Sequence, residues 1–199
     1  MNSNAHYSAV VIGASAGGLN AVSTLLSKIP ENYALPIIIV QHRAKEEKEL
    51  LEEILSQKCK IKVKQADEKE KIIGGIVYVA PPDYHLMVEH DRTFSLSKDP
   101  AVKHSRPSID VLFETASNVY KDELVAVILT GASDDGADGI KLVHHHHGLT
   151  IAQNPGEAVH PAMPVSSIRT GSIKRILSLN EIQGFLLQLS KKQRHEASQ

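Results

Sequence analysis

Short, uninterrupted apolar runs, each followed by an amphipathic stretch with helical spacing, constrain the fold of this chain more than any other feature. The first run covers residues 9–12 and is followed by leucine and valine at helical spacing over residues 19–26. The second covers residues 37–40 and precedes a predicted helix over residues 44–57. Strands without polar alternation are typical of sheets covered on both faces. These units therefore predict a doubly wound, mostly parallel α/β sheet with helices on both faces.

Residues 60–99 depart from this pattern and predict an antiparallel hairpin at the edge of the sheet. Two short apolar segments flank His90-Asp91-Arg92, a sequence typical of a hairpin turn. Beyond it, Pro107 is expected to open a helix, with Ser105 as a candidate cap. The later elements return to alternating strands and helices: strands over 124–129 and 149–152, and helices over 136–147, near 163–170 and near 180–193.

The chain of 199 residues has the length and composition of one globular domain. Its apolar fraction is 42% and its charged fraction is 23%, both ordinary for a folded protein. No repeat or linker divides it, so we expect a single domain over residues 1–199 with a core spanning about 7–190. The net charge of −1 argues against a general nucleic-acid binder, which usually carries a basic excess.

No segment predicts secretion, membrane insertion or a disulfide. The polar start lacks the pattern of a signal peptide, and the apolar runs are strand-sized rather than long enough to cross a bilayer. The one cysteine, Cys59, excludes a disulfide within the chain and argues against a cysteine-based zinc site. Lysines beside Cys59 could lower its pKa, although a half-buried thiol at a strand edge is the simpler interpretation. We expect a cytoplasmic protein.

A serine, a histidine and an aspartate each lie just beyond the end of a predicted strand. Ser15 follows the first strand, His42 follows the second, and Asp135, with its neighbour Asp134, follows the strand over 124–129. Because the carboxyl ends of parallel strands share one edge of a sheet, these side chains are expected to converge. A nucleophile, a general base and a carboxylate that orients the base are the parts of a hydrolytic triad.

The small residues around Ser15 suit a nucleophile on a sharp turn from strand to helix. The segment Gly13-Ala14-Ser15-Ala16-Gly17-Gly18 lets the hydroxyl project while backbone N–H groups face the reaction centre. The amino terminus of the following helix adds positive potential where an oxyanion would form. The turn therefore favours acyl-transfer chemistry.

Each of these residues also has a simpler interpretation. Ser15 could cap the following helix, His42 could be a structural histidine, and Asp135 could shape a turn. Residues 13–18 also resemble a dinucleotide-binding GxGxxG fingerprint with serine at the second glycine. The second strand ends in His42 rather than in an acidic residue that would hold a ribose, which weakens the nucleotide-binding alternative without removing it.

In their order along the chain, the motifs resemble the catalytic domain of the CheB family of chemotaxis protein-glutamate methylesterases. The resemblance covers roughly residues 7–190. It rests on these segments: Ile12 to Gly18, Gln41-His42-Arg43, Tyr78 to Leu86, Ser105 to Phe113, Leu129 to Ala137, Thr150 to Pro155, and Ala162-Met163-Pro164. Each segment is weak evidence alone, whereas the ordered set is specific.

The resemblance implies a serine hydrolase that demethylates glutamate methyl esters, and often deamidates glutamines, on cytoplasmic chemoreceptors. It implies Ser15 as the nucleophile, His42 as the base and Asp135, rather than Asp134, as the carboxylate. It also implies a doubly wound parallel sheet with an antiparallel edge. The expected partners are methyl-accepting chemoreceptors and two-component signalling proteins, and no cofactor is expected.

Two further roles follow from this mechanism. The backbone N–H groups of Ala16 and Ala132 are expected to hold the oxyanion. Arg106 is a candidate for positioning substrate carboxylates, with bracing of the helix start as the alternative.

The sequence departs from the family pattern in two ways. Many members carry an amino-terminal receiver domain, and none is expected here. Many also carry threonine after the serine and methionine at the position of Ala132, whereas this chain has alanine at 16 and 132. Backbone donors survive such changes, so the mechanism is expected to stand with altered substrate fit. A non-catalytic module that docks on receptors or signalling proteins is the alternative function.

A run of four histidines covers residues 144–147. Consecutive side chains fan out around a helix, so at most two of them lie side by side. A solvated helix end is therefore favoured over a zinc or nickel site, and no metal site is predicted.

Overall fold

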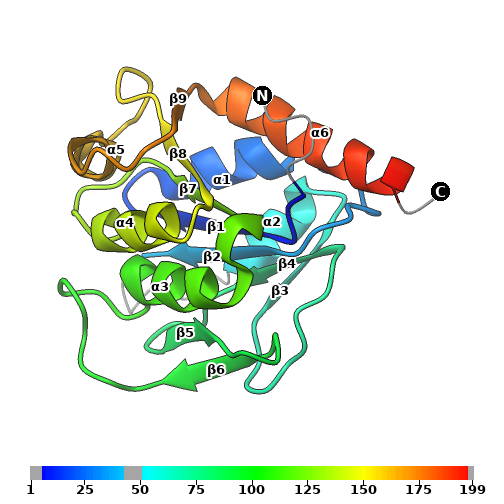
Figure 1. The fold of residues 1–199 in the computed structure, drawn as a ribbon, viewed down its shortest axis with the longest axis horizontal. Coiled ribbons are helices and arrows are strands. Elements are labelled where there is room, and N and C mark those ends of the chain that lie inside the picture. The colour runs from blue at the N-terminus through cyan, green and yellow to red at the C-terminus, as the bar shows by residue number, and fades with distance from the viewer. Residues whose placement is uncertain (1–5, 43–50, 197–199) are drawn as a thin grey trace.

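The chain folds around a seven-stranded sheet whose neighbouring strands are all parallel (Figure 1). The computed structural model describes residues 6–42 and 51–196. The strand order is β3-β4-β2-β1-β7-β8-β9. The strands are β1 (Ala9–Ala14), β2 (Ile37–Gln41), β3 (Lys62–Gln65), β4 (Ile76–Val79), β7 (Leu124–Ile128), β8 (Leu149–Gln153) and β9 (Arg175–Leu177). The prediction of a doubly wound parallel sheet is confirmed.

The strand order places a switch point between β1 and β7. From β1 the chain builds β2, β3 and β4 on one side, then returns to build β7, β8 and β9 on the other. In open α/β sheets, functional sites form at such a point, outside the carboxyl ends of the strands. A functional site is therefore expected at the loops that follow β1, β2 and β7.

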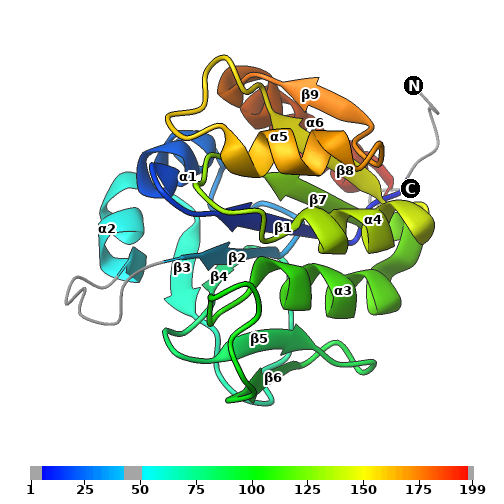
Figure 2. The same cartoon turned by 90° about the vertical axis from the view of Figure 1, so that its left-hand side faces the viewer.

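Helices cover both faces of the sheet (Figures 1 and 2). One face carries α1 (Gly18–Leu26), α2 (Leu51–Lys58) and α6 (Leu179–Glu196), and the other carries α3 (Ile109–Tyr120), α4 (Ala137–His145) and α5 (Ala162–Arg169). A short 3₁₀ turn, η1 (Lys121–Glu123), joins α3 to β7. Across the residues that the structure describes, no helix has the length and apolarity needed to cross a membrane.

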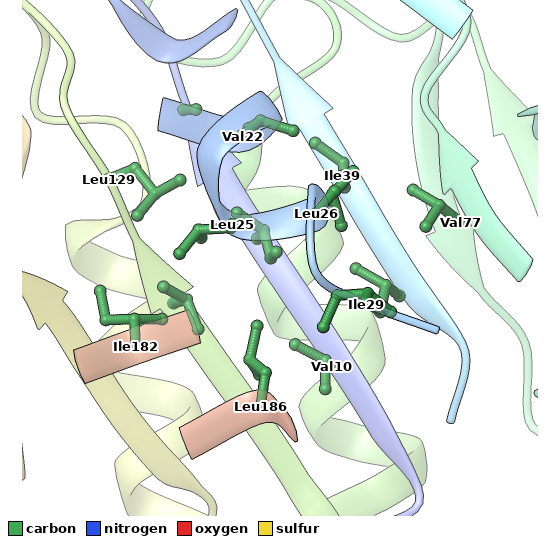
Figure 3. Close-up of a cluster of buried hydrophobic side chains, with 14 of the residues drawn as sticks. Val10, Val22, Leu25, Leu26, Ile29, Ile39, Val77, Leu129, Ile182 and Leu186 are labelled. Atoms are coloured by element: carbon green, nitrogen blue, oxygen red, sulfur yellow. The ribbon is translucent and has the colours of Figure 1, made fainter. Parts of the chain in front are cut away.

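The central strands are buried on both faces, as their unbroken apolar runs predict. Figure 3 shows one side of this core, where Leu25 and Leu26 of α1 and Leu186 of α6 pack over Val10 of β1. Neighbouring residues of β1 point to the opposite face, where Val11 joins the side chains of α3 and α4. Each fully buried aliphatic side chain contributes about 1.5–3 kcal/mol to this packing.

The predicted hairpin forms a small antiparallel sheet of its own. Its strands are β5 (His85–Val88) and β6 (Phe94–Ser97), and it packs against α3 on the side away from the main sheet (Figure 2). The Phe94 ring meets Tyr78 of β4 edge-on, with 4.9 Å between ring centroids. The hairpin is thus joined to the main sheet through side chains rather than through a shared strand ladder.

Three local predictions need correction or completion. The helix that was expected to open at Pro107 begins at Ile109, and its cap is Ser108 rather than Ser105. The residue before a proline is disfavoured in helical geometry, so Arg106 cannot begin the helix, and the extended Ser108 caps it instead. Strand β9 was not predicted because it is only three residues long, with no apolar run to mark it. Of the helix predicted over 44–57, residues 44–50, like Arg43, lie outside the described residues.

Cys59 lies between α2 and β3 and is half-buried, as expected. Burial raises the pKa of its thiol and outweighs the opposing charge of Lys58. The neighbouring lysines therefore do not activate this thiol.

Candidate active site

The loops after β1, β2 and β7 are tied together at the carboxyl edge of the sheet. The N–H of His42 donates to the carbonyl of Ala14 at 3.0 Å, and the N–H of Ser15 donates to the carbonyl of Thr130 at 3.0 Å. Since β2, β1 and β7 are adjacent strands, these bonds extend the sheet one residue further. The three predicted site residues therefore leave the sheet from neighbouring positions.

His42 and Asp135 are in direct contact. The imidazole Nε2 lies 2.8 Å from Asp135 Oδ2, and the side chains are 12% and 0% exposed, respectively. The two residues are 93 positions apart in the sequence. This contact joins the β2 loop to the β7 loop across the end of β1.

Asp135 is held by the amino terminus of α3. Its Oδ2 accepts the N–H of Ile109 at 2.7 Å, and its Oδ1 accepts the N–H of Asp110 at 3.0 Å and the hydroxyl of Ser108 at 2.9 Å. Burial raises the pKa of Asp135, but the bonds from His42 and the two N–H groups outweigh it, so the pKa is lowered overall.

The state of this carboxylate fixes the state of the histidine. An ionised carboxylate can only accept hydrogen bonds, so Nε2 of His42 carries the proton in the contact with Asp135. Nδ1 is then the unprotonated nitrogen, whose lone pair can accept a hydrogen bond or a proton. If His42 acts as a base, as the sequence predicts, Nδ1 is the nitrogen that would take the proton.

A second carboxylate supports the loop that carries Asp135. Asp110 Oδ1 accepts the N–H groups of Gly136 at 2.9 Å and Gly139 at 2.7 Å, both at the start of α4. Its Oδ2 lies 2.8 Å from the ammonium of Lys103, which also lies 2.9 Å from Asp138. Burial raises the pKa of Asp110 despite the bonds from Lys103 and Gly139, whose effect is to lower it.

Ser15 is half-buried on the turn between β1 and α1 and does not cap the helix. The cap of α1 is Gly17, whose left-handed φ of 77° makes the turn, and among the described residues no side chain accepts from the first helical N–H groups. The interpretation of Ser15 as a helix cap is therefore wrong. Within residues 6–42 and 51–196, no hydrogen bond joins the Ser15 hydroxyl to His42. Such contacts often form only when substrate is bound.

Two residues of the loop after β7, Thr130 and Gly131, lie against the Ser15 turn. A Cβ added to Gly131 would lie 2.9 Å from the Cβ of Ser15 and 1.9 Å from the sulfur of Met163, so a larger residue there would force Met163 or the Ser15 turn to move. Thr130 Oγ1 donates to the carbonyl of Ala16 at 2.9 Å, which ties the same two loops together. The loop after β7 therefore packs directly on the Ser15 turn.

The two predicted oxyanion donors lie in these contacting loops. In the described part of the chain, the N–H groups of Ala16 and Ala132 donate to no protein acceptor. Ala16 directly follows Ser15 and opens the turn into α1, while Ala132 directly follows the Gly131 contact. Their use as oxyanion donors stays a prediction that this arrangement permits.

The guanidinium of Arg106 bonds to loop residues outside this group. Its Nε and Nη2 donate to Asp83 Oδ1 at 3.1 and 2.7 Å, and its Nη1 donates to the carbonyls of Lys98 and Asp99 at 2.8 and 3.0 Å. These bonds brace the loop between β6 and α3. A role of Arg106 toward substrate stays a prediction.

Several supporting residues escaped prediction from the sequence. Ser108 and Asp110 are ordinary at a helix cap and in a first turn, so nothing local marks them as partners of Asp135 and α4. Lys103 carries no motif. Their roles depend on α3 and α4 starting side by side, which the sequence does not state.

The histidine run ends α4 at the far end from this site. Nδ1 of His146 lies 3.1 Å from the hydroxyl of Ser117, and the rings of His145 and His146 are 5.4 Å apart. No group of three or more metal-ligating side chains is placed to hold an ion among the residues described.

Comparisons with known proteins agree with the resemblance. The family model described as CheB methylesterase matches residues 10–186. A protein of Leptospira interrogans is 50% identical over 184 residues, which cover 92% of this chain and 95% of that protein. The protein-glutamate methylesterase/protein-glutamine glutaminase of Clostridium acetobutylicum is 32% identical over 181 residues, which cover 91% of this chain and 52% of that protein.

The same fold is found in a solved structure. The crystal structure of the Thermotoga maritima CheB methylesterase catalytic domain superimposes with a TM-score of 0.87 at 32% identity. The match covers 92% of this chain and 98% of that one. The chain thus spans about half of the Clostridium protein and nearly all of an isolated catalytic domain. On its sequence and its fold together, this chain belongs to the CheB methylesterase family.

Proposed function

We propose that this protein is a serine hydrolase that removes methyl groups from glutamate methyl esters of chemoreceptors, with Ser15, His42 and Asp135 as its triad. The observation that carries the proposal is the buried contact of 2.8 Å between His42 and Asp135, next to the turn that presents Ser15. Related proteins also carry the name protein-glutamine glutaminase. Deamidation uses the same acyl transfer with ammonia as the leaving group, so we include it as a second activity.

The first step is attack by Ser15 on the ester carbonyl. Nδ1 of His42 removes the hydroxyl proton, and the imidazolium that forms stays bonded through Nε2 to Asp135. A buried carboxylate with a lowered pKa remains ionised through this step and stabilises the positive ring. The proton then passes from Nδ1 to the methoxide, which leaves as methanol.

The developing oxyanion needs donors that are already in place. We assign this role to the N–H groups of Ala16 and Ala132, one on each side of the contact between the Ser15 turn and Gly131. Donors of this kind contribute about 2.7–4 kcal/mol to the transition state. Water then attacks the acyl-enzyme, with His42 again acting as base, and releases the glutamate.

The substrate is a protein side chain, so the partners are methyl-accepting chemoreceptors, and the site of action is the cytoplasm where their methylated segments lie. Two-component signalling proteins are further partners in this proposal. The half of the longer relatives that this chain does not match would carry additional activities or contacts of those proteins. None of these is assigned to this chain.

The alternative is a module that binds receptors without turnover. The intact histidine–aspartate contact argues against it, because burying a carboxylate costs free energy that a binding module has no need to spend. A nucleotide-binding domain is also disfavoured, since Ser15 stands at the second glycine of the fingerprint, where the backbone has to approach the pyrophosphate closely.

The decisive experiment is methanol release from methylated receptor. Wild-type protein should release methanol, and Ser15→Ala should lower the rate by several orders of magnitude while its thermal unfolding is unchanged. Phenylmethylsulfonyl fluoride should label Ser15, identified by peptide mass. Methanol release by Ser15→Ala at the wild-type rate would remove the triad, and a wild type that neither releases methanol nor is labelled would support the binding module.

A further inference from the structure

A second serine faces the base nitrogen of His42. Ser105 Oγ lies 3.4 Å from Nδ1 of His42, on the side of the ring opposite Asp135. No other hydrogen bond of this hydroxyl occurs among the described residues. The nitrogen that must take the proton of Ser15 is therefore occupied, in the free protein, by the hydroxyl of Ser105.

The backbone around Ser105 is built to hold it in place. The N–H and carbonyl of Ser105 bond to the carbonyl and N–H of Val102 at 2.8 and 3.1 Å, which closes a tight two-residue turn. The turn residues Lys103 and His104 have left-handed φ values of 46° and 65°, as a type I′ turn requires. Non-glycine residues adopt this geometry at a cost, so other contacts must impose it.

Those contacts come from Lys103, inside the turn, and from Arg106, which directly follows Ser105. The Lys103 ammonium bonds the carbonyl of Asp134 at 3.2 Å and pairs with Asp110 at the start of α3 and with Asp138 at the start of α4. Arg106 is fixed on the other side by Asp83 and two carbonyls. The same short segment thus anchors itself to the helices that hold Asp135 and presents Ser105 to His42.

We infer that Ser105 is a positioning residue that orients the imidazole of His42 before Ser15 bonds to it and again after the proton has moved to Nδ1. In the free enzyme its O–H donates to Nδ1, which favours the form of the ring that keeps its proton on Nε2, toward Asp135. When Nδ1 gains the proton of Ser15, the Ser105 hydroxyl can rotate and accept a hydrogen bond from the new Nδ1–H group, because a hydroxyl both donates and accepts. At 3.4 Å the bond is long and easily released, so Ser15 can displace it.

This inference rests on the proposed function, in which Ser15 is the nucleophile and Ser105 is not. The two contacts of His42, with Ser105 and with Asp135, would by themselves suggest a triad in which Ser105 is the nucleophile. However, Ser105 has no helix amino terminus behind it, and it precedes Arg106-Pro107 rather than a helical turn. Ser15 has the start of α1 and the unused N–H of Ala16 beside it, so the oxyanion donors lie with Ser15.

The kinetic test compares Ser105→Ala with Ser105→Thr, which keeps the hydroxyl. Loss of one hydrogen bond to a transiently charged ring should lower kcat by about tenfold in Ser105→Ala. KM should stay unchanged, because Ser105 touches the base and not the substrate, and Ser105→Thr should recover most of kcat. Ser97→Ala is the matched control, since Ser97 is a half-buried serine on β6 with no contact to His42.

A spectroscopic test does not depend on turnover. In protein with ¹⁵N-labelled histidine rings, Ser105→Ala should move the Nδ1 resonance of His42 toward that of a nitrogen without a donor. The resonance is assigned by its loss in His42→Gln, and Ser97→Ala should leave it in place. This arm reports on the contact even if the wild type proves to have no esterase activity.

Each result of the kinetic and spectroscopic tests either supports or overturns the role of Ser105. A lowered kcat in Ser105→Ala, recovered by threonine and accompanied by the shifted resonance, supports the inference. Wild-type kcat with an unmoved resonance overturns it, as does an equal loss in both variants accompanied by a lowered melting temperature. Labelling of Ser105 by the sulfonyl fluoride, with full activity in Ser15→Ala, would overturn both this inference and the proposed nucleophile.

Discussion

Asp135 and Asp110 hold the starts of each other's helices. Asp135, just before α4, accepts the N–H of Asp110 at the start of α3, and Asp110 accepts the N–H of Gly136 at the start of α4. Each carboxylate thus occupies the amino terminus of the other helix, where the helix dipole favours negative charge. These two reciprocal hydrogen bonds fix the position of Asp135, and Asp135 in turn fixes the position of the His42 imidazole.

Asp135→Asn should lower kcat by about 10⁴ while leaving the protein folded. An amide in this position can donate to Nε2, which would favour the wrong form of the ring and leave Nδ1 without its lone pair. We also expect a loss of about 1–3 kcal/mol in the free energy of unfolding, because the three other donors to Asp135 lose charge-assisted bonds. The measurements are methanol release and thermal unfolding.

Asp134→Asn is the control for this variant. Asp134 is adjacent in sequence and its side chain is 64% exposed. Its substitution should leave both quantities near the wild-type values. A rate for Asp135→Asn within tenfold of wild type would contradict the assignment of the carboxylate.

Lys103→Met should destabilise the protein more at pH 7 than at pH 4. Burial already raises the pKa of Asp110, and removing Lys103 takes away the largest opposing contribution. A carboxyl with a folded pKa above its unfolded value, about 3.9, stabilises the protein below that value and loses this contribution as the pH rises through the folded pKa. The difference from wild type should therefore be about 1–3 kcal/mol at pH 7 and smaller at pH 4.

Urea unfolding at the two pH values measures this difference. Lys141→Met is the matched control, because Lys141 also pairs with Asp138 but is 55% exposed. It should cost little at either pH. An equal loss for Lys103→Met at both pH values would show that the charge of Asp110 is not what Lys103 compensates.

Gly131→Ala should separate the Ser15 turn from the loop after β7. The added Cβ would meet Ser15 Cβ at 2.9 Å and Met163 Sδ at 1.9 Å, and the flexible methionine can move more easily than the turn. We expect a loss of about 1–3 kcal/mol in stability from overpacking. We also expect a fall of about a hundredfold in methanol release, because a small misplacement of the nucleophile is costly.

Gly184→Ala, in α6, is the matched control. Nothing lies within 4 Å of a Cβ added there, so the substitution should raise stability by about 0.4–1 kcal/mol and leave activity unchanged. Full activity in Gly131→Ala would mean that the contact with Ser15 is not needed for catalysis.

Arg106→Ala should lower stability by about 1–2 kcal/mol, because it removes the brace between Asp83 and the carbonyls of Lys98 and Asp99. Asp83→Ala should reproduce part of this loss. If Arg106 also positions substrate, Arg106→Ala should raise the KM for methylated receptor, whereas Asp83→Ala should leave that KM unchanged. Equal KM values in the two variants would leave Arg106 as a brace alone.

Local patterns in the sequence were enough to predict the sheet and the edge at which the site lies. Unbroken apolar runs suit only strands covered on both faces, and that pattern is local, so it could be read without coordinates. The positions of Ser15, His42 and Asp135 at three strand ends then followed from the geometry of any parallel sheet. The hairpin was also predictable, since its turn residues are local signals.

The contacts that support the site, by contrast, could be learned from the folded structure alone. The bonds between Asp135 and the start of α3, the exchange with Asp110, and the approach of Ser105 to Nδ1 join segments more than 20 residues apart. No periodicity encodes them, because they depend on how α3 and α4 pack over the sheet. Ser105, which was predicted to cap α3, faces the histidine instead, and Ser108 caps the helix because the residue before Pro107 is disfavoured in helical geometry.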